Sequence, residues 1–224
     1  MKVIVFDLGG TLMEYIGMPD CWTDYYLQGF EEINKRYTCN APECDIQKSV
    51  EILKNFNPRI NYREEEYSPE YIFSKSLEHW SAAIPIHQCA HTFYDGLSLK
   101  AEIYPDVIPV LKELRHRKYR IATLTDLPTA MPDELFKKDI AELLACFDLY
   151  VSSLSCGYRK PNSRGLEQIS EHFHVPATEL IFIGDEEKDR KTAHNAGSRF
   201  IQVNRKKKGR ESIYELGELW ELLD

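Results

Sequence analysis

The sequence predicts an α/β fold, with a three-layer, Rossmann-like core around a parallel sheet and an inserted all-α cap domain. Residues 3–6 form an unbroken apolar run, which is typical of a strand buried on both faces. From residue 103 onward, apolar runs alternate with helical patterns about ten or more residues long, which indicates βαβ units and parallel strands. Between these two regions, residues 15–96 show helical patterns and no convincing strand.

This change of pattern divides the chain into two expected domains. Residues 1–14 and 97–224 form the α/β catalytic core, and residues 15–96 form the helical cap domain. In the cap, helices are expected over residues 20–37 with Asp20 as N-cap, around residues 46–53, from Ser68 and Pro69 to residue 80, and over residues 86–94. Two roles stay open for the aromatic residues of the first helix, which form the core of the cap or line a pocket: Trp22, Tyr25, Tyr26 and Phe30.

The alternating part of the chain predicts the order of the remaining elements. Strands are expected over residues 119–125, 147–152, 180–183 and 200–203. Helices are expected over residues 107–117, 132–145, 162–173, 189–196 and 212–223. Gly197 follows the fourth of these helices, where glycine is a common terminator.

The composition favours a protein that acts on small molecules. With 36 acidic against 28 basic residues, the formal net charge is −8, which argues against a nucleic-acid partner, and the basic run at 205–208 is expected to be a solvated loop. No apolar run approaches the ~20 residues of a membrane span, and the amino terminus lacks the apolar core of a signal peptide. The six cysteines form no Cys-x-x-Cys pair, which favours reduced thiols in the cytoplasm. The sequence does not indicate an oligomeric state.

Polar residues follow the expected strands, and parallel strands all end at one edge of a sheet. Asp7 follows the first strand, and Gly9 and Gly10 behind it let the backbone turn sharply and approach a ligand closely. The groups after the later strands are Thr125 with Asp126, then Lys160, then Asp185 with Asp189.

The three carboxylates of Asp7, Asp185 and Asp189 are expected to meet in one crevice. Without a counter-charge they would repel one another and raise one another's pKa. A hard divalent cation relieves this repulsion, and Mg²⁺ typically binds a few carboxylates and keeps several waters. The sequence therefore predicts a Mg²⁺ site at this edge.

The remaining groups suit a phosphoryl group. Thr125 offers a hydroxyl and Lys160 a point charge, and the backbone amides of Leu8 and Gly9 can face an oxyanion. A carboxylate nucleophile, Asp7, among such partners indicates phosphoryl transfer through an aspartyl-phosphate.

These residues resemble the four motifs of the haloacid dehalogenase superfamily of hydrolases. The resemblance covers residues 1–14 and 97–224, and the position of the insertion resembles the subgroup with a helical cap after the first motif. The matching segments are residues 7–12, the strand at 121–125 with Asp126 where the family usually has Asn, Lys160 with Pro161, and Gly184 and Asp185 with Asp189.

The resemblance implies a role for each matching residue. Asp7 would attack phosphorus, and Mg²⁺ would be held by Asp7, the Gly9 backbone carbonyl, Asp185 and Asp189. Thr125 and Lys160 would hold the transferring phosphoryl group of a small phosphorylated metabolite. The expected phosphate-binding set is Leu8, Gly9, Thr125, Asp126 and Lys160.

Gly9 departs from the family pattern, because family phosphatases carry a second Asp there that acts as general acid and then as base. Its loss typically costs ~10²–10⁴-fold in rate. Asp126 or a cap side chain could replace it, or the substrate could have a good leaving group that needs no acid. Two other functions also stay open, a hydrolase of carbon–halogen or carbon–phosphorus bonds and a non-catalytic phosphate-binding or regulatory protein.

Overall fold

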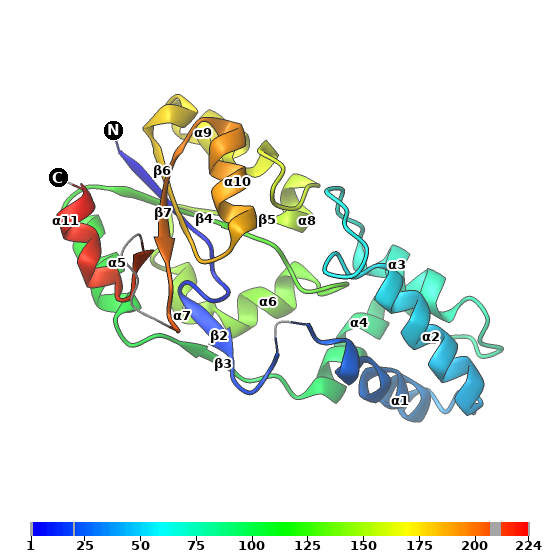
Figure 1. Cartoon of the computed structure of the whole chain (residues 1–224). Helices are drawn as coiled ribbons and strands as arrows, with labels where there is room; N and C mark the ends of the chain where they lie inside the picture. Colours follow the sequence, from blue (N-terminus) through cyan, green and yellow to red (C-terminus); the bar gives the residue numbers. More distant parts are fainter. Residues whose placement is uncertain (1, 20, 207–211, 224) are drawn as a thin grey trace.

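The computed structural model describes residues 2–19, 21–206 and 212–223 and contains the predicted α/β core (Figure 1). One six-stranded sheet has the strand order β5-β4-β1-β6-β7-β8, and every neighbouring pair is parallel. Its strands are β1 (Val3–Phe6), β4 (Arg120–Thr125), β5 (Leu149–Ser152), β6 (Leu180–Gly184), β7 (Arg199–Val203) and β8 (Ser212–Ile213). The strand that precedes Asp7 therefore lies in the middle of the sheet, between β4 and β6.

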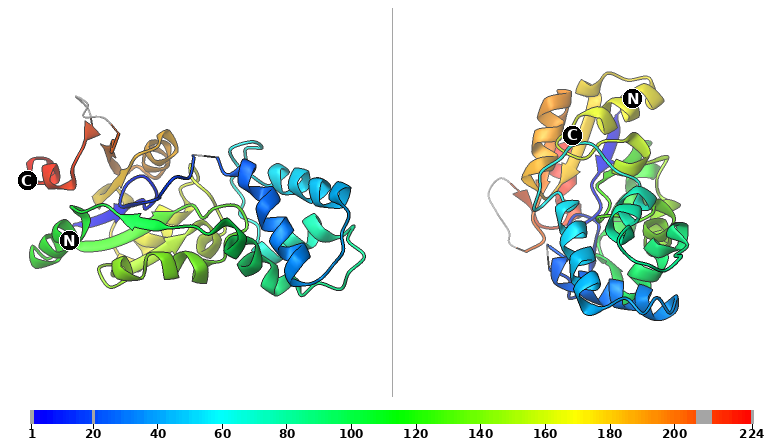
Figure 2. Two further views of the ribbon diagram at one scale, coloured as in Figure 1. Left: turned by 90° about the horizontal axis from the view of Figure 1, so that it is seen from below. Right: turned by 90° about the vertical axis from the view of Figure 1, so that its right-hand side faces the viewer.

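Helices cover both faces of this sheet, which gives the three predicted layers (Figures 1 and 2). The helices of the core are α5 (Val107–His116), α6 (Asp133–Asp139), α7 (Ala141–Leu144), α8 (Ser153–Cys156), α9 (Arg164–Phe173), α10 (Glu187–Ala196) and α11 (Trp220–Leu223), with the 3₁₀ helices η2 (Ala177–Glu179) and η3 (Leu216–Leu219). Because side chains alternate along a strand, Val3 and Val5 share one hydrophobic cluster with α9 and α10. Ile4 and Phe6 share the other with α5, α6, α7 and α11.

A second group of helices lies between β2 (Met13–Tyr15) and β3 (Ala101–Ile103), which pair antiparallel with each other. The members of this helical group are η1 (Thr23–Tyr25), α1 (Tyr26–Arg36), α2 (Glu43–Asn55), α3 (Pro69–Leu77) and α4 (Ile86–Leu97), to the right of the sheet in Figure 1. Ser68 begins α3 as predicted, since its hydroxyl accepts a hydrogen bond of 3.1 Å from the Tyr71 backbone amide. The division of the chain into core and cap domains stays a prediction.

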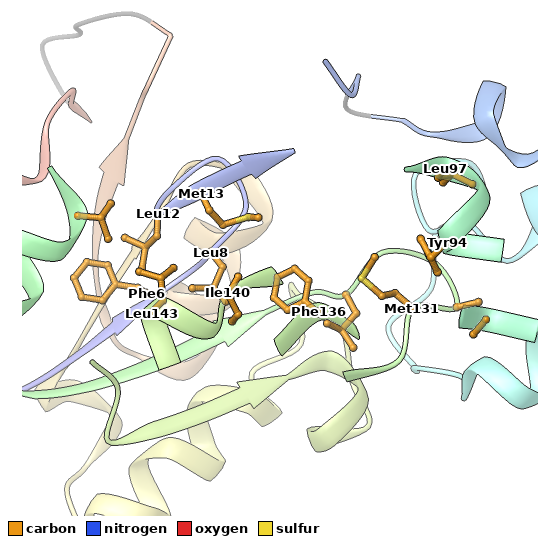
Figure 3. Packing of buried hydrophobic residues seen from close by; sticks show 14 of the residues in the cluster. Phe6, Leu8, Leu12, Met13, Tyr94, Leu97, Met131, Phe136, Ile140 and Leu143 are labelled. Atoms are coloured by element: carbon orange, nitrogen blue, oxygen red, sulfur yellow. The ribbon is translucent and has the colours of Figure 1, made fainter. Parts of the chain in front are cut away.

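One hydrophobic cluster continues from the sheet into the helical group (Figure 3). Met131 and Phe136 lie between Leu8, which follows β1, and Tyr94 of α4. The Tyr94 hydroxyl also donates a hydrogen bond of 2.7 Å to the Thr129 carbonyl. The helical group is thus packed against the edge at which the central strands end.

The predicted helix over residues 212–223 is wrong in its first part. Ser212 and Ile213 pair with β7 as β8, and helical turns begin only at Leu216, where Glu215 and Glu218 form a capping box. The predicted helix over 132–145 is interrupted at Ile140. The sequence does not predict β2, β3 or β8, because two or three residues are too few for a periodic pattern.

Two expectations concern residues outside those described, namely the N-cap at Asp20 and part of the basic loop, residues 207–208. Among the described residues, no helix has the length and apolar character needed to cross a bilayer.

Candidate active site

The predicted site residues meet at the carboxyl edge of the sheet. Asp7 follows β1, Thr125 ends β4 and Asp185 follows β6, and all three line a cavity of about 560 Å³. Gly9 and Asp126 also line it. Lys160, in the loop between α8 and α9, and Asp189, on α10, are buried and stand outside the cavity lining.

Lys160 joins two of the carboxylates. Its Nζ lies 2.5 Å from Asp7 Oδ1 and 2.6 Å from Asp189 Oδ1, and all three side chains are buried. Burial acts to lower the pKa of Lys160, but Asp189 and Asp7 outweigh it and hold that pKa well above its usual value. The ammonium group is therefore fixed in its charged form.

A single ammonium group does not balance the three acidic side chains. Oxygen atoms of Asp7, Asp185 and Asp189 lie within 4.8 Å of one another. Burial and the neighbouring Asp189 and Asp185 raise the pKa of Asp7 well above its usual value, although Lys160 opposes the shift. Burial and the charges of Asp189 and Glu186 raise the pKa of Asp185 to about 6. The crevice thus has excess negative charge that a cation would relieve.

Asp189 is held in place by the start of α10. Its Oδ2 accepts a hydrogen bond of 2.9 Å from the Glu186 backbone amide. A Cβ atom on Gly184 would come within 2.6 Å of the same oxygen, so the glycine makes room for this carboxylate. With one oxygen bound to backbone and the other beside Lys160, Asp189 is built to position its neighbours.

The turn after Asp7 brings backbone close to Asp185. The Leu8 carbonyl accepts hydrogen bonds from three successive amides, those of residues 11, 12 and 13. Gly10 has a φ of +75°, and a Cβ there would lie 2.3 Å from Asp185 Oδ2. Among the described residues, the amides of Leu8 and Gly9 and the carbonyl of Gly9 have no hydrogen-bond partner. They are available to a ligand.

Gly9 differs from Gly10 in its surroundings. A Cβ atom built on Gly9 meets no atom within 4 Å, and its φ lies outside the left-handed region. The backbone turn does not require glycine at this position. The space beside Asp7 is open where a longer residue could stand.

Asp126 lines the cavity in a network of ionic contacts. Its Oδ1 accepts a hydrogen bond of 3.0 Å from the Lys160 backbone amide, and its Oδ2 lies 3.2 Å from Lys188 Nζ. Burial acts to raise the pKa of Asp126, but Lys188, Arg159 and Lys160 hold it well below its usual range. This geometry favours the interpretation of Asp126 as a turn-capping residue over a proton donor.

Sequence reasoning missed Lys188, which lines the cavity and also lies 3.0 Å from Glu186 Oε2. Glu186 in turn contacts Arg59 from the α2–α3 loop at 2.5 Å. Lys188 directly precedes Asp189 in sequence, which was the one signal available for it. Arg59 has no such signal, because its partner is 127 residues away.

A buried ion pair also fastens the loop of Lys160 to the helical group. Arg159 contacts Glu66, and the Ser153 hydroxyl donates a hydrogen bond of 2.6 Å to the same carboxylate. Beside it, the Arg159 backbone amide donates a hydrogen bond of 2.6 Å to the Glu64 carbonyl. The loop between α2 and α3 thus touches the residue that precedes Lys160.

Aromatic and apolar side chains form part of the cavity wall. Its apolar and aromatic residues are Met13, Tyr15, Met18, Pro19, Trp22, Tyr26, Pro58, Tyr94, Tyr104, Leu127, Pro128, Phe136 and Val203. The two roles left open for the aromatic residues of the first helical stretch are therefore divided between them. Trp22 lines the cavity, Tyr26 both lines it and packs edge to face against Phe93, and Phe30 packs against Phe73 and Phe93.

Known proteins resemble the chain over much of its length. A phosphoglycolate phosphatase of Aliivibrio fischeri is 23% identical over 197 residues, which are 88% of this chain and 81% of that protein. A phosphoglycolate phosphatase of Vibrio vulnificus is 26% identical over 207 residues, with the same shares. A glyceraldehyde 3-phosphate phosphatase of Methanopyrus kandleri is 29% identical over 106 residues, which are 46% of this chain and 44% of that protein.

Solved structures share the fold. A 2-haloacid dehalogenase from Pseudomonas syringae aligns with a TM-score of 0.67 and 19% identity, and a phosphatase from Thermococcus onnurineus with 0.65 and 18%. Both alignments cover 100% of this chain and 98% of the other chain. The family model described as haloacid dehalogenase-like hydrolase matches residues 1–197. The chain belongs to the haloacid dehalogenase-like hydrolases.

Proposed function

We propose that this protein is a Mg²⁺-dependent phosphohydrolase that acts on a small phosphorylated metabolite through an aspartyl-phosphate. The observation that carries the proposal is the buried Asp7 carboxylate, paired with Lys160 at 2.5 Å and open to a cavity that Thr125 also lines. A carboxylate held in this way on a rigid strand end is suited to attack an electrophile in the cavity. The phosphatase names of the relatives support phosphorus as that electrophile.

The residues present fit a Mg²⁺ ion. Carboxylate and carbonyl oxygens are the donors that Mg²⁺ prefers, and three carboxylates lie within 4.8 Å of one another here. Asp7, Asp185 and the Gly9 carbonyl would hold the ion, with Asp189 fixed behind them. Bound there, Mg²⁺ supplies positive charge to the oxygens of the phosphoryl group.

The residues of the chain divide the remaining work. Lys160 contacts one oxygen of Asp7 and favours its ionised form against the burial that raises its pKa, and the other oxygen attacks phosphorus. The Thr125 hydroxyl and the amides of Leu8 and Gly9 bind phosphoryl oxygens. The bond from phosphorus to the leaving group breaks, and water then attacks phosphorus, releases phosphate and restores the Asp7 carboxylate.

We further propose that the helical group is a cap over this cavity, since Trp22, which precedes its first helix, and Tyr26 line the cavity together with Thr125 of the core. Such a group sets which substrates enter. The acidic net charge of −8 supports a small-molecule substrate rather than nucleic acid. The six cysteines are free thiols, which supports a cytoplasmic location.

The test is hydrolysis of a panel of phosphate esters with Mg²⁺ and with EDTA. We expect turnover that needs Mg²⁺ and falls by several orders of magnitude in Asp7→Asn, but not in Asp95→Asn, an exposed site on α4. Acid quenching should trap a hydroxylamine-sensitive phosphate label that Asp7→Asn lacks.

Other outcomes would support the two alternative functions. Metal-independent release of halide from 2-haloacids would indicate a dehalogenase. Binding of beryllofluoride with no turnover of any substrate would indicate a non-catalytic phosphate-binding protein.

A further inference from the structure

We propose that the substrate is an aryl phosphate, a phosphomonoester whose leaving group is a phenol on a planar body. This inference rests on the proposed phosphohydrolase function and adds the class of its leaving group. Two features of the cavity carry it. Gly9 supplies no acid beside the nucleophile while two carboxylates that line the cavity are ion-paired, and aromatic side chains form part of its wall.

The first feature concerns the acids of the cavity. Histidine and cysteine are absent from its lining among the described residues, and its carboxylates are Asp7, Glu14, Asp126, Asp185 and Glu186. Asp7 and Asp185 belong to the acidic triad. Glu14 is exposed.

The other two carboxylates, those of Asp126 and Glu186, are in ion pairs. Lys188 bridges Asp126 and Glu186 at 3.2 and 3.0 Å, and Arg59 contacts Glu186 at 2.5 Å. A carboxylate in an ion pair gives up no proton, because the pair stabilises its ionised form. Asp126 and Glu186 are therefore ionised partners of Lys188 and Arg59 and not proton donors to a leaving group.

Gly9 lies two residues after the nucleophile Asp7 and has no side chain. A Cβ atom there meets no atom within 4 Å beyond its chain neighbours, so no acidic side chain stands at that position. A leaving group without a donor must depart as an anion. It does so readily when the anion is stable, as a phenolate is, and slowly when it is an alkoxide.

The chemistry balances without a further reactant. Asp7 forms a bond to phosphorus, and the bond from phosphorus to the aryl oxygen breaks with its electron pair on that oxygen. The phenolate takes a proton from water after it departs. A second water molecule cleaves the aspartyl-phosphate, which gives phosphate and the free Asp7 carboxylate.

The second feature is the shape and chemistry of the wall. A cavity of about 560 Å³ lies in the range that encloses ligands larger than a two- or three-carbon phosphate. Tyr15 and Trp22 meet edge to face on this wall, with ring centroids 5.1 Å apart. Aromatic walls bind planar rings by stacking and edge contacts.

Three cations that line the cavity are held in ion pairs. Arg159 is paired with Glu66, and Arg205 lies 2.8 Å from Asp106. Lys188, as described above, bridges two carboxylates. These pairings favour a neutral aromatic body over a carboxylate-bearing one such as phosphoglycolate.

The kinetic test compares kcat/KM across substituted phenyl phosphates, phosphoglycolate and glycerol phosphate, all with Mg²⁺. We expect kcat/KM to fall steeply as the leaving group becomes more basic, with the alkyl esters at least ~10²-fold below nitrophenyl phosphate. The ratio of alkyl to aryl kcat/KM should rise ~10²-fold or more in Gly9→Asp, which places an acid in the open space. It should stay at the wild-type ratio in Gly9→Asn, which has a similar size and no proton to give.

Two results would overturn the inference in distinguishable ways. If phosphoglycolate were hydrolysed as efficiently as the best aryl ester, with dependence on Asp7, the aryl proposal would be wrong and the phosphohydrolase function would stand. If no ester were hydrolysed and Asp7→Asn changed nothing, both would fail.

A binding test examines the wall without turnover. Calorimetry with phenylphosphonate and phosphonoacetate should show tighter binding of the aryl compound. Trp22→Ala should weaken only phenylphosphonate, about 2- to 12-fold, the factor that corresponds to one aromatic contact. Trp22→Phe should restore most of the affinity. Equal loss for both compounds would contradict an aromatic binding wall.

Discussion

Lys160 Nζ lies 2.5 Å from Asp7 Oδ1, so that a loop lysine 153 residues away in sequence neutralises the carboxylate at the end of the central strand. The same ammonium group lies 2.6 Å from Asp189. Both contacts are buried, where a lost partner leaves an uncompensated charge.

We expect Lys160→Met to destabilise the metal-free protein by about 3–5 kcal/mol, because two buried carboxylates would then face each other unpaired. Denaturant unfolding in EDTA measures this loss. The double variant Lys160→Met/Asp189→Asn should recover part of it, since one buried charge is gone. Additive losses in the double variant would show that Lys160 does not act by charge compensation.

The pKa of Asp185, raised from 3.8 to about 6, predicts a pH dependence of the metal-free fold. A carboxyl group with a raised pKa in the folded state stabilises the fold below its unfolded pKa, and this contribution is lost as pH rises through about 6. Metal-free wild type should therefore melt at a lower temperature at pH 7.5 than at pH 5.5.

Asp185→Asn serves as the control for that pH dependence. The variant should show a smaller difference between the two pH values, because its amide does not titrate. Mg²⁺ should raise the melting temperature of wild type at pH 7.5 and have little effect on the variant. An equal Mg²⁺ shift in both proteins would argue against Asp185 as a ligand.

Gly9 and Gly10 form a matched pair for the turn after Asp7. Gly10→Ala should cost about 1–2 kcal/mol or more, because Gly10 has a φ of +75° and its Cβ would lie 2.3 Å from Asp185 Oδ2. Gly9→Ala should change stability by less than about 0.5 kcal/mol, because its Cβ meets nothing within 4 Å. Thermal unfolding of both variants measures the two losses of stability. Equal losses would show that the two glycines do not differ in the space around them.

Arg159 and Glu66 should couple two loops that are far apart in sequence. Glu66→Gln leaves the Arg159 guanidinium buried without its charged partner, so we expect faster amide hydrogen exchange around residues 64–66 and around 157–160 together. Arg36→Gln, which breaks an exposed ion pair on α1, is the control and should change neither segment. Faster exchange confined to residues 64–66 would show that the loop of Lys160 is held independently of the Arg159–Glu66 ion pair.

The sequence by itself determined the α/β class and the strand ends that carry Asp7, Thr125 and Asp185. Unbroken apolar runs indicate buried parallel strands, and parallel strands necessarily end at one edge, so local pattern is sufficient for this part. It also located Lys160 and Asp189, whose spacing to their strands is short. It misplaced the helical turns near the carboxyl terminus, where pairing with β7 makes Ser212 and Ile213 a strand.

Only the tertiary structure decided what surrounds those groups. The contacts of Lys188 with Asp126 and of Arg159 with Glu66 join residues separated by 62 positions or more along the chain, and no local pattern encodes such a pairing. The sequence also does not reveal the open space at Gly9. A glycine that the backbone conformation requires, such as Gly10, cannot be told from one that it does not require by the sequence alone. Local periodicity depends on neighbours along the chain, whereas ion pairs, cavities and free space depend on which distant segments pack together.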